Sequence, residues 1–113
     1  MEDRITWTDG ARWACDDLSF GALRRQLDGL RDAVMGLDTL LDRWPVRRAP
    51  TPIDDFAPTE ADRAVFTAAV LRAVDEAAGA DREGLGLPSD LALARYRADL
   101  GALAALVQTD ITW

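Results

Sequence analysis

Pairs of aspartates are the residues of this sequence whose type and spacing could most directly do chemistry. Two carboxylates that converge in a sheltered cleft can bind a metal ion or exchange protons with a substrate. Most of the pairs alternate with arginines at helical spacing, which favours a solvated charged surface over such a site. The pairs are Asp16 with Asp17, Asp28 with Asp32, Asp38 with Asp42, and Asp54 with Asp55.

Other side chains suited to catalysis are few. The chain has no histidine and no lysine, which excludes Ser-His and Cys-His catalysis and imidazole metal ligands. The single cysteine, Cys15, can form neither an internal disulfide nor a thiolate metal cluster. We therefore expect no catalytic residue, no cofactor and no metal, and the sequence favours a protein that is not an enzyme.

Net charge and hydropathy limit the partners that the chain can have. Twenty acidic residues against 13 basic ones give a net charge of −7, and neither half of the chain is basic. We therefore expect no nucleic acid partner. No stretch approaches the ~18–20 apolar residues of a membrane span, and the acidic N-terminus is unlike a secretory signal. We expect a cytoplasmic protein without membrane contact, and the lack of lysine and asparagine is typical of a bacterial genome rich in G and C.

The elements that must position these residues are mostly helical. Leucine and alanine far outnumber valine and isoleucine, a balance that favours helix over sheet. Over residues 19–44 an apolar residue recurs every three or four positions, which predicts one long helix with a heptad seam. Ser19 would cap its start, and Pro45 would end it. The seam consists of Phe20, Leu23, Leu27, Leu30, Val34, Leu37, Leu41 and Trp44.

Two further helices are predicted, over residues 60–78 and 89–108. Thr59 and Asp62 form a capping-box-like pair at the start of the first. The second carries another seam with heptad-like spacing. We therefore predict an all-α three-helix bundle, formed by a single domain of residues 1–113. Its C-terminal tail, residues 109–113, repeats an Ile-Thr-Trp motif of the N-terminal arm and could add a strand to it.

Residues 1–17 do not follow helical spacing. The Thr-Asp-Gly of residues 8–10 is typical of a three-residue hairpin loop that ends on a left-handed glycine. Such a loop would place Ile5 opposite Trp13 and gather the apolar side chains on one face. We favour this small N-terminal β-hairpin, and the alternative is an irregular arm or a helix that continues into the long helix.

The connection over residues 45–58 is a candidate partner-binding surface. It holds four of the five prolines, and long connections without secondary structure are often functional. Its arginines suit a phosphate or a partner's carboxylates, its aspartates suit a basic partner, and its apolar residues could anchor it. The candidate partner-binding residues are Trp44, Arg47, Arg48, Ile53, Asp54, Asp55 and Phe56.

A strip of small residues accompanies the seam of the long helix. Ala22, Gly29 and Gly36 share one heptad position. Glycine inside a helix costs about 1 kcal/mol relative to alanine, and the close approach of another helix would offset that cost. The strip therefore favours a homo-oligomer over a monomer.

Taken together, these features favour a small acidic protein–protein interaction module, such as an adaptor, a small subunit, or an inhibitor or immunity-type partner. It would act through helix packing and through the 45–58 loop. The alternative is a small enzyme or ligand carrier that uses Tyr96, Arg47, Arg48 or the loop carboxylates at an intersubunit pocket. No motif assigns the chain to a known family.

Overall fold

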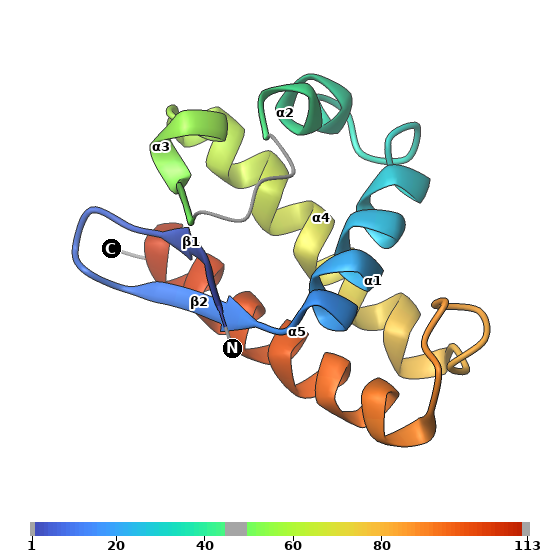
Figure 1. Ribbon diagram of the computed structural model, residues 1–113. Helices are drawn as coiled ribbons and strands as arrows, with labels where there is room; N and C mark the ends of the chain where they lie inside the picture. The colour runs from blue at the N-terminus through green and yellow to red at the C-terminus, as the bar shows by residue number, and fades with distance from the viewer. Residues whose placement is uncertain (1, 45–49, 112–113) are drawn as a thin grey trace.

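The described part of the chain contains five helices and a three-stranded sheet (Figure 1). The computed structural model describes residues 2–44 and 50–111, the last two without their side chains. The prediction of an all-α three-helix bundle is therefore wrong, because a mixed sheet packs beside the helices. The elements are β1 (Glu2–Thr6), β2 (Arg12–Cys15), α1 (Asp17–Gly29), α2 (Leu37–Arg43), β3 (Thr51–Pro52), α3 (Ile53–Phe56), α4 (Glu60–Gly79) and α5 (Asp90–Ile111).

The N-terminal hairpin has the predicted register. Ile5 pairs with Trp13 in the antiparallel ladder between β1 and β2, and Gly10 closes the loop with a φ of 93°. The third strand is β3, which comes from the proline-rich connection and pairs in parallel with β1. Of the predicted C-terminal tail, residues 109–111 belong to α5, which continues beyond its predicted end, and residues 112–113 lie outside the described residues.

A buried arginine joins the sheet to α1. Arg4 lies at the irregularity in the β1–β2 ladder and is 6% exposed. Its guanidinium donates to the Asp17 carboxylate at 2.6 Å and to the Cys15 carbonyl at 3.3 Å, and it lies 4.8 Å from the centre of the Phe20 ring. Because the charge is both paired and hydrogen-bonded, its burial is tolerated.

The helix predicted over residues 19–44 is two helices. α1 ends at Gly29, a turn covers the next residues, and α2 begins after Gly36, whose φ is 87°. Leu30 and Leu37 of the predicted seam are still buried. A turn thus buries the same apolar residues as a straight helix would, which is why the spacing alone did not reveal it.

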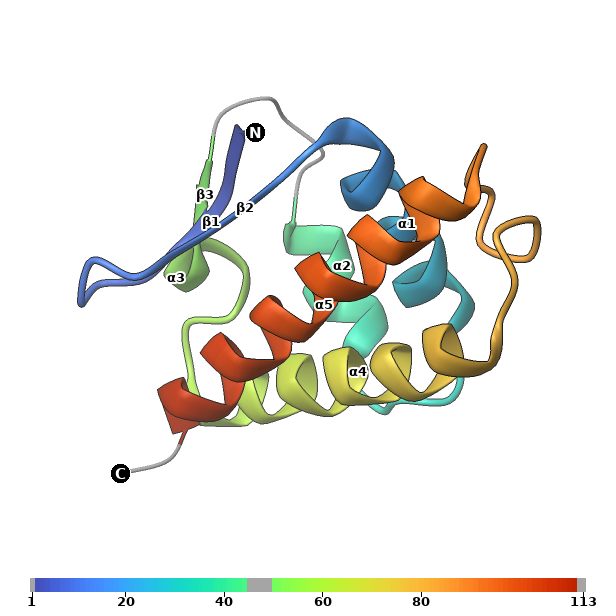
Figure 2. The same cartoon turned by 90° about the horizontal axis from the view of Figure 1, so that it is seen from below.

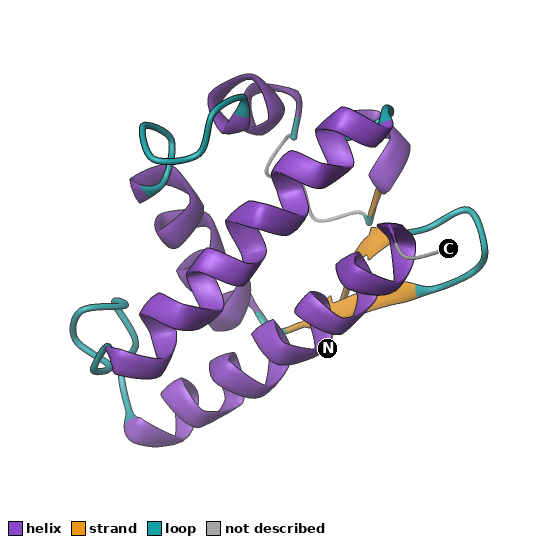
Figure 3. Ribbon diagram, turned by 180° about the vertical axis from the view of Figure 1, so that it is seen from behind, coloured by secondary structure: helices purple, strands orange, loops and turns teal. Residues whose placement is uncertain are grey.

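The two long helices, α4 and α5, pack against each other and are joined by the loop of residues 80–89 (Figures 2 and 3). The predicted capping pair is present, because the Thr59 hydroxyl accepts from the Asp62 amide at 3.1 Å. The whole predicted seam of α5 is buried, and it consists of Leu93, Tyr96, Leu100, Leu103 and Val107. Within the described residues, no helix combines the length and the apolar character needed to cross a membrane.

Aromatic rings fill the core between α1, α2, α3 and α4. The Trp44 ring stacks on Phe56 with the centroids 4.6 Å apart, and both rings pack in a T-shaped arrangement with Phe66. Phe20 of α1 packs edge-on against Trp44 at 5.8 Å. Such pairs stabilise the fold beyond simple burial of apolar area. The cluster fixes the short helices α2 and α3 on the longer ones.

The turn between α1 and α2 gives a first testable prediction. Gly36→Ala should lower the free energy of unfolding by about 1–3 kcal/mol, because a positive φ is strained for alanine. The new Cβ would also lie 3.3 Å from Val65 Cγ2. The matched control Gly21→Ala, inside α1, should raise stability by about 0.5–1 kcal/mol.

Urea unfolding measures both changes. A continuous helix over residues 19–44 would be stabilised by both substitutions. Stabilisation by Gly36→Ala would therefore contradict the turn.

Candidate functional site

The predicted partner-binding residues do not form one surface. Trp44, Ile53 and Phe56 are buried in the aromatic core, at 2% exposure or less. Their apolar character therefore serves packing within the chain. Asp54 and Asp55 are exposed at the start of α3, where Asp54 forms an ion pair with Arg63. The two remaining candidates, Arg47 and Arg48, lie outside the described residues.

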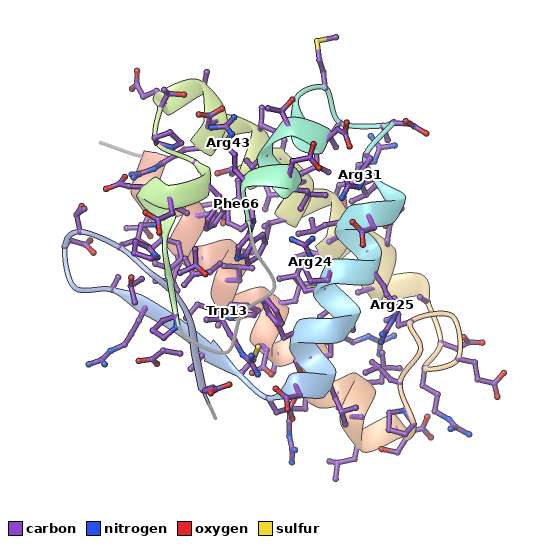
Figure 4. All side chains as sticks on the ribbon, turned by 45° about the horizontal axis from the view of Figure 1, so that its top comes forward. Trp13, Arg24, Arg25, Arg31, Arg43 and Phe66 are labelled. Carbon is purple, nitrogen blue, oxygen red and sulfur yellow. The ribbon has the colours of Figure 1, made fainter. Side chains whose placement is uncertain are left out.

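The aspartates near the first turn are exposed, and three of the four form ion pairs with one arginine. Arg31 lies in the turn after α1 and contacts three carboxylates, those of Asp28 at 3.1 Å, Asp42 at 3.5 Å and Asp38 (Figure 4). Surface pairs of this kind contribute little to stability. Among the described residues, no group of three or more histidine, cysteine or acidic residues is arranged to hold a metal ion.

The glycine strip does not lie on one helical face. Ala22 is buried, Gly29 is the last residue of α1, and Gly36 is in the turn. The strip therefore gives no support to the predicted homo-oligomer.

A groove lies between the hairpin and the C-terminal half of α5, which run side by side (Figures 1 and 2). Its volume is about 540 Å³. One wall is the segment 11–14, which includes most of β2, and the other is the face of α5 that carries Asp99, Ala102, Ala105, Leu106 and Thr109. We take this β2–α5 groove as the candidate functional site.

Trp13 joins the two walls. Its side chain is 2% exposed, and its indole Nε1 donates to the main-chain carbonyl of Asp99 at 2.8 Å (Figure 4). A two-stranded ribbon is marginal alone, so the burial of Trp13 against α5 holds the hairpin in place. The position of the hairpin thereby defines the groove.

Two polar atoms of the groove lack a partner. Within the described part, five buried side-chain nitrogen or oxygen atoms form no hydrogen bond, and two of them, Trp7 Nε1 and Asp99 Oδ2, belong to residues that line this groove. A buried polar atom without a partner costs about 1–3 kcal/mol. Both atoms are closed to solvent in the free protein, so the lining of the groove is desolvated even at its polar residues.

The charges around the groove leave Asp99 without an opposite charge. Arg12 forms an ion pair with Asp3 at 3.3 Å on the hairpin, and Asp9 accepts from the Ala11 amide at 2.9 Å in the loop. Among the described residues, no arginine forms an ion pair with Asp99. The groove is therefore apolar in its walls and acidic at Asp99.

The buried reactive groups near the hairpin are held in their neutral forms. Burial raises the pKa of the Cys15 thiol to about 12, although the nearby Arg4 lowers it. Burial also raises the pKa of the Tyr96 phenol, whose hydroxyl donates to the side-chain oxygen Oε1 of Gln26. A thiol or phenol of this kind is protonated at neutral pH, so neither is a ready nucleophile or base.

A second cavity, of about 460 Å³, lies between α1, the end of α4 and the following loop. Its main cation, Arg25, already donates to the Leu85 carbonyl at 3.1 and 3.3 Å and to the Gly86 carbonyl at 3.3 Å. Arg25 therefore fastens the loop to α1, and this cavity is a weaker candidate than the β2–α5 groove.

Only one wall of the groove could be predicted from the sequence. Alternation along the hairpin placed Trp7 and Trp13 on one face. The other wall was visible as a stretch of α5 where the exposed residues are uncharged, but alanines are common on helices and did not point to a site.

The chain was compared with models of protein families, with curated proteins and with solved structures, and no match was found in any of the three.

Cys15 gives a second testable prediction. At about pH 8.5, where an exposed cysteine is half ionised, a thiol reagent should not label the native protein. The raised pKa keeps the sulfur protonated, and full burial blocks the reagent. The same protein in urea should be labelled completely. Rapid labelling of the native chain would contradict both the burial and the pKa.

Proposed function

We propose that this chain is a small acidic protein–protein interaction module, an adaptor, small subunit or inhibitor that binds a partner protein through the β2–α5 groove. The observation that carries the proposal is the groove itself, which combines an apolar lining with two polar atoms that lack partners. An apolar hollow of this kind marks a site where another molecule covers apolar area.

The acidic balance of the chain supports a basic partner. A net charge of −7 attracts a positively charged protein and raises the rate of association. We retain the exposed carboxylates of Asp54 and Asp55 as a second proposed contact with the partner, in addition to the groove. Action in the cytoplasm, and self-association as one form of the interaction, belong to the same proposal.

A carrier of a small apolar ligand is the second candidate function. The volume of the groove, about 540 Å³, lies within the ~300–1,000 Å³ of small-molecule sites. The neutral forms of Cys15 and Tyr96 favour binding over catalysis in such a protein.

Native mass spectrometry of the protein gently isolated from its own cells separates these candidates. We expect a complex with another protein. Ala102→Arg should dissociate it, because the new side chain fills the groove from an exposed position on α5. The matched control Ala94→Arg changes an exposed residue of the same helix outside the groove and should leave the complex intact.

Each other outcome has a definite meaning. A monomer that carries a small molecule would replace the interaction module with the carrier. A complex that survives Ala102→Arg and is lost on charge reversal of Asp54 and Asp55 would place the partner on α3. A bare monomer would contradict the proposed function.

A further inference from the structure

We infer that the β2–α5 groove takes an extended segment of a partner protein, which adds to the sheet as a strand beside β2 and places a basic side chain at Asp99. This inference rests on the proposed function and names the chemistry of the partner.

The open edge of the sheet is the first support. The strand order is β2-β1-β3, so β2 is an edge strand of the described sheet. About half of the main-chain N–H and C=O groups of an edge strand point away from its neighbour and can pair with another strand. The segment 11–14 lines the groove, so its main chain borders the space that a ligand would enter. Strand addition is an established way to bind an extended peptide.

The facing wall leaves room for a main chain. Ala102 and Ala105 are exposed on α5 and line the groove, and neither has a long side chain to fill it. An edge of four residues, the length of β2, spans ~13 Å of extended chain at ~3.3 Å per residue. The groove therefore suits a short extended segment with small or medium apolar side chains.

Charge complementarity selects the basic residue. Asp99 lines the groove, is half-buried, and forms no ion pair with an arginine of the described residues, whereas Arg12 is already paired with Asp3. A lysine or arginine of the bound segment would give Asp99 its missing partner in a partly desolvated place, where such a pair is strong.

A lone segment fits the groove better than a second copy of this chain. The β2 edge of a second copy is itself flanked by α5 (Figure 2). Pairing two copies through β2 would bring both α5 helices to the shared edge, whereas an extended segment meets no such obstacle.

A displayed library of random heptapeptides, selected on the full-length protein, tests the inference. We expect enriched peptides that share a lysine or arginine at one position between apolar residues. Replacing that residue with alanine should weaken binding at least about tenfold, as for a charged partner of a partly buried carboxylate. N-methylation of alternate peptide amides should abolish binding, because it removes the donors that pair with β2.

Protein variants separate a direct contact from a general effect. For the Asp99→Asn variant, the peptide with the basic residue and the peptide with alanine in its place should bind with equal affinity. The alanine peptide should bind this variant as tightly as it binds the unaltered protein. Ala102→Arg should abolish binding, and Ala94→Arg should not change it.

Three results would overturn the inference: no enrichment, enrichment without a basic residue, or binding that persists in Ala102→Arg. If the cellular complex still depends on Ala102 in those cases, the proposed function stands and only the extended basic segment is wrong. If neither a complex nor a peptide is found, both fail.

Discussion

The burial of Trp13 between the hairpin and α5 is the contact on which the site depends. A ribbon of two short strands gains too little from its own hydrogen bonds to persist in water, so it must bury its apolar face elsewhere. Trp13 does this on α5 and satisfies its indole nitrogen with the Asp99 carbonyl. Arg4 adds a second attachment, because it ties the other end of the sheet to Asp17 at the start of α1. With both contacts in place, the edge of β2 lies beside a helix face of small residues.

The same arrangement supports the proposal that a partner occupies the groove. If another element of this chain covered the hairpin, that element would pair with the edge of β2 and fill the space over Ala102 and Ala105. Here one face is buried and the edge lies beside the groove, with the Trp7 indole and the Asp99 carboxylate each holding a desolvated atom. In the proposed complex another chain would cover this desolvated lining and bring a positive charge to Asp99. The stability of the hairpin and the proposed binding thus arise from the same residues.

Much of the local structure could be predicted, because local signals specify it. The Thr-Asp-Gly loop set the register of Ile5 with Trp13, and Thr59 capped its helix as expected. The turn at Gly36 escaped prediction because a broken helix buries the same heptad leucines as a straight one. The strand β3 and the burial of Phe56 depend on contacts between residues far apart in sequence, which spacing does not encode. For that reason the apolar residues of the 45–58 connection that are buried in the core were interpreted as a surface for a partner.

Amide hydrogen exchange on the free protein and on its cellular complex would locate the binding surface. We expect the partner to slow the exchange of the β2 amides, residues 12–15, because the bound chain pairs with them or covers them. Exchange in the turn between α1 and α2 should stay unchanged. Unaltered exchange in β2, with protection confined to α3 or to another surface, would contradict the claim that the β2–α5 groove is where this protein binds.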